Sequence, residues 1–160
     1  MSEDAPQDLN LNLDMPKSTI VFFFLCADKG TNLQTLNEKI KKSFPDILII
    51  SNKIVRTADE IFLASFLTDR AMQTGTNIAR EKKYELLLWV TGKTDISTAI
   101  RASEPTGDEM IIGILLNIDR IEQWQALMKS YELIKITPPE SFSQKATELE
   151  IEKISLSRTV

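Results

Sequence analysis

ISNKIVRTADEIFLASFLTDRAMQTGTNIAREKKYELLLWVTGKTDISTAI, residues 50–100, is the stretch that decides the fold. Thr57 is followed three residues later by Glu60, directly before an apolar run, and this capping-box spacing predicts the start of a helix. Apolar side chains then recur at helical intervals and are expected to share one face: Phe62, Leu63, Phe66, Leu67 and Ala71. The first half of the stretch therefore predicts a long amphipathic helix.

The second half of the stretch predicts two more helices. Residues 74–77, Thr-Gly-Thr-Asn, interrupt the helical pattern. A helix is expected from Ile78 to Val90 and is ended by Gly92, although residues 86–90 alone also fit a strand. Asp95 is expected to cap a short third helix. The stretch thus supplies packing surface on several consecutive helices.

Short apolar runs elsewhere predict strands. They lie at residues 18–27, 46–51, 109–117, 132–136 and 149–156. Caps and helical spacing predict further helices that begin at Thr31 and Asp119, and Pro139 is expected in the first turn of a short one. Strands and helices mix without strict alternation. This order favours the α+β class, as a two-layer sandwich of helices on a sheet.

Composition limits the possible functions. The length of 160 residues is typical of one domain, expected over residues 17–160, after an acidic, polar segment 1–16 that is expected to be disordered. The formal net charge of −4 argues against binding duplex DNA, which needs a basic face. No apolar run is long enough to span a bilayer. The single cysteine, Cys26, fits a reducing compartment, so we expect a cytoplasmic protein.

The residues needed for catalysis are poorly represented. The chain has no histidine, the commonest general base and metal ligand. Cys26 lies in an apolar strand pattern, where an inert core thiol is expected. Asp59 and Glu60 are adjacent, but negative charge is favoured in the first turn of a helix without any catalytic role. The sequence therefore predicts a protein that is not an enzyme, with no cofactor and no metal site.

Basic residues gather around the start of the second predicted helix. They are Arg80, Lys82 and Lys83, with the amide side chain of Asn77 before them and Lys93 after the helix. One interpretation is a solvated helix face. The other is a small anion site, in which amide groups at a helix start and the forked guanidinium of Arg80 meet a phosphate. Such a site suits a few nucleotides of single-stranded RNA better than a duplex.

Apolar residues outside the main helical stripes predict a protein partner. Ile61 is off the Phe62/Phe66 stripe, and the helix ending at Val90 carries apolar residues nearly all round its second half. A helix that is apolar on more than one side is either deeply buried or meets a partner. Ile61, Leu86 and Trp89 are therefore the expected partner-binding residues, with a core position as the alternative for Trp89.

The order of several short motifs resembles one known family. The motifs are residues 55–64, Gly75-Thr76-Asn77-Ile78-Ala79-Arg80, Tyr84-Glu85-Leu86-Leu87, Gly92, Ile96 with Ala99-Ile100, and a tail at residues 149–156. Together they are similar to the kinase-binding accessory subunit of the KEOPS complex, the PRPK-binding-protein family in its small archaeal form. Where that family often has Arg-Gln-Ile after its glycine, this chain has Thr94-Asp95-Ile96.

The resemblance implies a function as well as a fold. It implies helices on a mostly antiparallel sheet, and a non-catalytic subunit that binds the small atypical kinase of KEOPS. It also implies help in recruiting tRNA by its CCA end, for threonylcarbamoyladenosine modification, and identifies the tail as a closing strand. A different class of function stays open, a small-molecule-binding regulatory α+β domain with a pocket between helix and sheet. An enzyme with an oxygen-only metal site is the third possibility.

Overall fold

The protein is described here from a computed structural model. The structure describes residues 21–26, 32–45, 47–105, 111–116, 118–131, 134–135 and 137–158. The predicted tail of residues 1–16 lies outside these ranges, and so does the side chain of Cys26. No helix within the described ranges is long and apolar enough to cross a membrane.

Helices and strands alternate irregularly along the described chain. The strands are β1 Val21–Cys26, β2 Ile47–Ser51, β3 Ile111–Leu115 and β4 Ile134–Lys135. The α-helices are α2 Leu33–Ser43, α3 Ala58–Thr74, α4 Lys82–Thr91, α5 Ile96–Ser103, α6 Ile121–Ser130 and α7 Glu148–Ser155. Three short 3₁₀ turns are η1 Asn52–Ile54, η2 Ile118–Arg120 and η3 Glu140–Ser143. The α+β class that the sequence predicted is confirmed.

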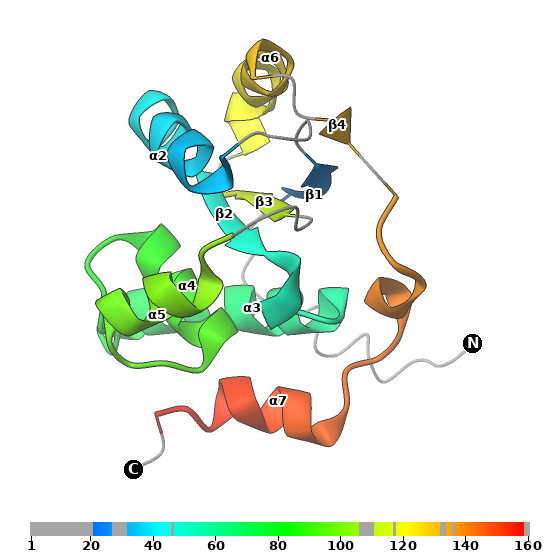
Figure 1. Cartoon of the computed structure of the whole chain (residues 1–160). Coiled ribbons are helices and arrows are strands. Elements are labelled where there is room, and N and C mark those ends of the chain that lie inside the picture. Colours follow the sequence, from blue (N-terminus) through cyan, green and yellow to red (C-terminus); the bar gives the residue numbers. More distant parts are fainter. Residues whose placement is uncertain are drawn as a thin grey trace.

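The four strands form one sheet in the order β2-β3-β1-β4. Each neighbouring pair is antiparallel, with Gly113 of β3 opposite Phe23 of β1 and Ile49 of β2. Figure 1 shows α2 and α6 on one side of the sheet and α3, α4 and α5 on the other. Helices therefore cover both faces of the sheet, where the sequence had suggested a single helical layer.

Cover on both faces explains the continuous apolar runs of the strands. Successive residues of a strand point to opposite faces. In β2, Leu48 and Ile50 belong to the core that includes α3 and α4, whereas Ile47 and Ile49 belong to the core that includes α2 and α6. A strand buried on both sides reads as an unbroken apolar run instead of an alternating one.

Helix α3 begins where the sequence predicted, but the surface that it buries is wider than the predicted apolar stripe. The Glu60 carboxylate accepts a hydrogen bond from the Thr57 amide at 2.8 Å, which confirms the capping box. Most of the predicted apolar stripe is confirmed, because Leu67 and Ala71 are buried in the core and Leu63 and Phe66 pack against it. The exception is Phe62, which is 47% exposed, while Ile61 beside it is fully buried. The helix packs against α4 and α7 on different sides, so its buried surface is wider than one stripe.

The last element contradicts the sequence prediction. Residues 148–155 form helix α7, not a closing strand, so this feature of the family resemblance is not present as expected. Thr147 and Glu150 form a capping box, with the Glu150 amide donating to Thr147 Oγ1 at 3.2 Å. The alternation of Leu149 and Ile151 suggested a strand, but the cap and the burial of Ile154 fit a helix.

Other helix ends refine the sequence prediction. Asn32, not Thr31, caps α2, and Arg120 precedes α6, where Asp119 had been expected as the cap. Asp95 caps α5 as predicted, through its contact with the Thr98 amide. Helix α4 starts at Lys82 instead of Ile78, so residues 76–81 form a loop between α3 and α4.

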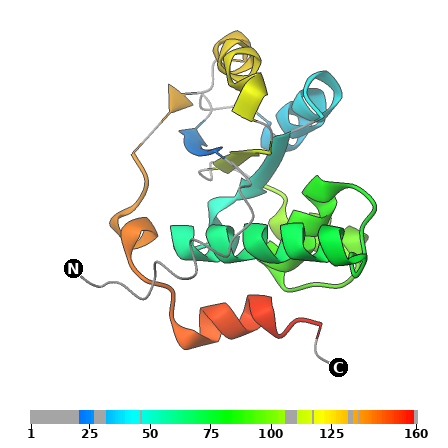
Figure 2. The same cartoon turned by 180° about the vertical axis from the view of Figure 1, so that it is seen from behind.

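Gly92 ends α4 in the left-handed conformation, as predicted, with φ of +69°. A Cβ at this position would lie 2.7 Å from the backbone oxygen of Lys153 in α7. Glycine is therefore required here twice, for the turn and for the close approach of the two helices. Figure 2 shows α7 running alongside α3 from the opposite side of the molecule.

Candidate functional site

The predicted basic residues do not form one patch. Lys82 forms an ion pair of 2.9 Å with the buried Asp69 of α3, and Asn77 donates to the Ala79 carbonyl at 2.8 Å. Both contacts hold the α3–α4 connection together. Lys93 follows the far end of α4, roughly 15 Å from Lys83 along a helix with a rise of about 1.5 Å per residue. The solvated-face interpretation therefore fits Lys93.

Two of the predicted basic residues remain candidates for an anion. The Arg80 side chain is exposed and forms no hydrogen bond or ion pair with any residue that the structure describes. Lys83 is only 9% exposed, and its ammonium lies 5.1 Å from the centre of the Tyr84 ring. Both residues belong to the N-terminal end of α4, where Asn77 and Lys82 also lie but have the structural contacts described above.

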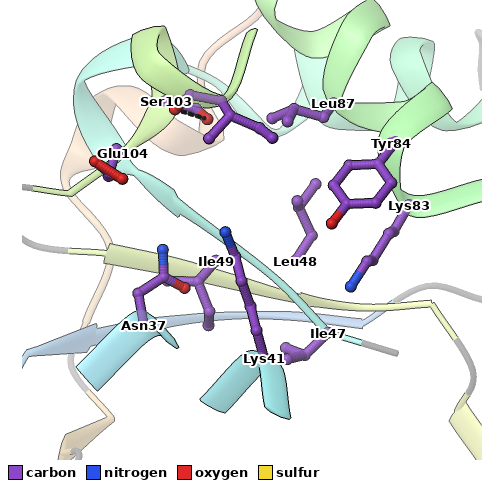
Figure 3. A pocket seen from close by; sticks show the side chains of 11 residues that line it. Asn37, Lys41, Ile47, Leu48, Ile49, Lys83, Tyr84, Leu87, Ser103 and Glu104 are labelled. Atoms are coloured by element: carbon purple, nitrogen blue, oxygen red, sulfur yellow. Dashed lines mark hydrogen bonds between the residues drawn. The ribbon is translucent and has the colours of Figure 1, made fainter. Parts of the chain in front are cut away.

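Lys83 reaches a small cleft beside the edge strand β2 (Figure 3). Helix α2 contributes Lys41 and Asn37 from the other side, and Glu104 follows α5 at the rim. Asn37 is 5% exposed, and its Oδ1 has no hydrogen-bond partner in the described structure. Lys41 was not predicted, because nothing in the local sequence distinguishes it from the other lysines of α2.

The size of the cleft limits what it can hold. Its cavity volume is about 20 Å³, which is enough for about one water molecule. Pockets for metabolites are on the order of 300 Å³ or more. The cleft as it stands therefore gives no support to the small-molecule-binding alternative. It does bring two cationic side chains, Lys41 and Lys83, to one edge of the described sheet, beside β2.

The loop of residues 76–81 is organised by a buried carboxylate. Glu85 is fully buried, and its Oε1 accepts hydrogen bonds from the amides of Ile78 and Ala79, both at 2.9 Å. Its Oε2 accepts from Trp89 Nε1 at 3.1 Å and from Arg158 Nη1 at 2.6 Å. A buried charge needs such partners, because desolvation is otherwise costly. Glu85 thereby fixes the loop that carries Arg80.

The predicted partner-binding residues are corrected by the structure. Ile61 and Leu86 are fully buried and Trp89 is 7% exposed, so none of them offers surface to another molecule. The apolar second half of α4 is buried because the sheet, α3, α5 and α7 surround it. The guanidinium of Arg158 lies 3.9 Å from the centre of the Trp89 ring. The deep-burial alternative was the right one for α4.

Large apolar side chains are exposed elsewhere among the described residues. They are Phe62 of α3, Ile78 of the α3–α4 loop, and Leu149, Ile151 and Leu156 in or just after α7. Leu149 and Leu156 are seven residues apart and therefore lie on the same side of the helix. Leu149 is 78% exposed. The sequence showed these residues, but the incorrect strand assignment hid the common face of Leu149 and Leu156.

Helix α7 is held to the rest of the protein by Arg56. The guanidinium donates from Nε to Glu150 at 2.7 Å and from Nη2 at 2.9 Å, and also reaches the Lys145 carbonyl at 3.0 Å. The hydrogen bonds from Arg56, followed by that from the Thr147 amide, lower the pKa of Glu150 to about 2. Such two-pronged contacts are stronger than simple surface ion pairs.

This contact makes the stability of the protein depend on pH. Because the pKa of Glu150 in the folded protein lies below its ordinary value of 4.5, its stabilising contribution is present above about pH 4.5 and is lost as the pH falls toward 2. We expect Glu150→Gln to be less stable than the wild type at pH 5, with the difference shrinking at pH 2.5. Urea denaturation at the two values tests this. A difference that does not change with pH would contradict it.

No group of three cysteine, aspartate or glutamate side chains that could hold a metal ion occurs within the described ranges. The sequence was also compared with known proteins. It matches no model of a protein family, and it matches none of the curated proteins.

Proposed function

We propose that this protein is a non-catalytic, cytoplasmic accessory subunit of the KEOPS type. In this proposal it binds the small atypical kinase of that complex and helps to recruit tRNA by its CCA end, for threonylcarbamoyladenosine modification. The observation that carries the proposal is the exposed apolar face of α7, together with a loop on which Arg80 is exposed and forms no hydrogen bond or ion pair with any described residue. The order of motifs in residues 55–100 agrees with it.

The kinase surface is assigned to α7 instead of Ile61, Leu86 and Trp89. Leu149 and Leu156 lie exposed on one face of a helix that Arg56 holds rigidly in place. Exposed leucines on a fixed helix suit a protein partner, because a preordered surface loses little conformational entropy on binding. Ile151 is also exposed, but it is two residues from Leu149 and therefore lies on a different side of the helix, so Leu149 and Leu156 are the anchors of this face. Specific interfaces are dominated by a few such anchors.

An acidic substitution on this face is expected to break the kinase complex. Leu149→Glu should weaken binding of the small kinase from the same genome by on the order of tenfold or more, because it buries a charge at the centre of an apolar contact. Size-exclusion co-elution and isothermal titration measure the effect. The matched control is Gln125→Glu, an exposed position on α6 across the sheet.

Two outcomes would contradict the kinase assignment. Absence of any complex between the wild-type protein and the kinase would contradict the partner itself. A complex unaffected by both Leu149→Glu and Leu156→Glu would remove α7 from the interface.

The RNA surface is assigned to the end of α4 where Arg80 and Lys83 lie. Arg80 is exposed on a loop whose backbone is fixed by Glu85, so its guanidinium is available to a phosphate. Lys83 and Lys41 add positive charge beside β2. Few cations are involved, so the affinity should fall gently with salt.

Arg80→Ala is expected to weaken tRNA binding without unfolding the protein. Loss of one phosphate contact should lower the slope of log K against log salt by about 0.7, the value per contact for single strands. Fluorescence anisotropy with a tRNA, and with the same tRNA lacking its CCA end, measures both quantities. The control is Lys129→Ala, an exposed lysine on α6. Equal affinity for the two RNAs would contradict CCA recognition.

A further inference from the structure

The loop of residues 76–81 and the C-terminal end of the described chain meet at one carboxylate. Glu85 Oε1 holds the amides of Ile78 and Ala79, and Glu85 Oε2 holds Arg158, which is 73 residues further along the chain. The two oxygens of this carboxylate therefore connect the 76–81 loop to Arg158, two segments that are far apart in the sequence.

The Arg158 side chain is more buried than is usual for an arginine. Its side chain is 14% exposed, it pairs with Glu85 at 2.6 Å and it stacks on the Trp89 ring at 3.9 Å. Arginine suits this position because its planar group can donate to a carboxylate while it lies over an aromatic face. Its Nε and Nη2 are buried without hydrogen-bond partners in the described structure, so the Glu85 pair and the Trp89 stack compensate its burial.

We propose that Arg158 is a positioning residue, which couples the docking of α7 to the conformation of the 76–81 loop through Glu85. With Arg158 in place, the Glu85 charge is balanced inside the protein and both loop amides are held. Without Arg158, the buried Glu85 carboxylate loses its opposite charge. Water that enters to solvate the carboxylate then loosens the loop. Because the loop carries Arg80, the coupling also reaches the RNA surface, a consequence that rests on the proposed function.

The position of Arg158 in turn depends on α7. The helix is anchored at its start by Arg56 and near its end by Ile154, which is fully buried. Lys153 lies against Gly92, and its ammonium donates to the Ile54 carbonyl at 3.3 Å. A partner bound to the outer face of α7 therefore acts on an element that leads directly to the Glu85 pair. Two sites joined in this way influence each other reciprocally.

Amide hydrogen exchange tests the coupling without any ligand. In Arg158→Gln, the amides of Ile78 and Ala79 should exchange at least about tenfold faster, because hydrogen bonds to charged groups contribute on that order. The β3 amide of Ile112 should keep its wild-type rate, which separates local loosening from global destabilisation. The matched control Arg101→Gln, an exposed arginine on α5, should leave all three rates unchanged. Unchanged rates for Ile78 and Ala79, or an equal increase at Ile112, would overturn the proposal.

A double variant and an RNA measurement complete the test. With Glu85→Gln already present, adding Arg158→Gln should have a much smaller effect on the loop amides than in the wild type, since the charge pair is gone. Equal effects in both backgrounds would overturn the coupling. In the full chain, Arg158→Gln should also weaken tRNA binding as Arg80→Ala does. Loosened amides with unchanged tRNA affinity would support the coupling and count against the RNA role of the loop, so the two proposals fail separately.

Discussion

Glu85→Ala is expected to lower the free energy of unfolding by about 3–5 kcal/mol, the usual effect of removing one partner of a buried ion pair. Glu85 is fully buried, and four donors would lose their acceptor: the amides of Ile78 and Ala79, Trp89 Nε1 and Arg158 Nη1. Domains of this size are stable by only about 5–15 kcal/mol, so the loss is a large fraction of the total. Denaturation by guanidinium chloride measures it.

Two further variants separate the effect of the Glu85 charge from other effects of the substitution. Glu85→Gln keeps an oxygen for the loop amides and removes only the charge, so its effect should be clearly smaller. Glu38→Ala changes an exposed glutamate of α2 and should stay within about 0.5 kcal/mol of the wild type. A loss for Glu85→Ala no larger than that of Glu38→Ala would mean that the carboxylate does not organise the core.

Trp124→Ala should also lower the free energy of unfolding by about 3–5 kcal/mol, because it leaves a large cavity in the core between the sheet and helices α2 and α6. Trp124 of α6 is fully buried, and its ring centre lies 5.8 Å from that of Phe44. A Cβ at Gly113, in the middle of β3, would lie 3.1 Å from Cζ2 of Trp124. The glycine therefore leaves the space in which the indole ring rests on the sheet.

The measurement again uses chemical denaturation, followed by circular dichroism because the substitution removes a fluorescent ring. Trp124→Phe retains an aromatic ring, so its free energy of unfolding should fall by less than half as much as that of Trp124→Ala. The neighbouring exposed Gln125→Ala serves as the control. If Trp124→Phe and Trp124→Ala were equally destabilising, the effect would not arise from the volume of the cavity.

The two variants address opposite faces of the sheet. Glu85 belongs to the side covered by α3, α4, α5 and α7, and Trp124 to the side covered by α2 and α6 (Figure 1). The strands contribute alternate residues to the two cores, such as Ile49 and Ile50 in β2.

Local features of the candidate site were predictable from the sequence. The capping box at Thr57 and the left-handed turn at Gly92 depend on residues within one helical turn of each other, which a linear pattern records. The basic character around Arg80 was equally visible. The sequence did not show that Lys82 is a structural cation whereas Arg80 is exposed. This difference depends on whether a carboxylate of another helix lies opposite each side chain, as Asp69 does for Lys82.

The sequence by itself determined the α+β class, the four strands of the sheet and the starts of α3 and α5, because periodicity and caps act over three or four residues. Only the tertiary structure decided that Ile61 and Trp89 are buried, that α7 leaves an apolar face exposed, and that Arg158 meets Glu85. Each of these follows from contacts between elements far apart in the chain. Burial and charge pairing are properties of the assembled layers, and a helix carries no local record of which neighbours will cover it.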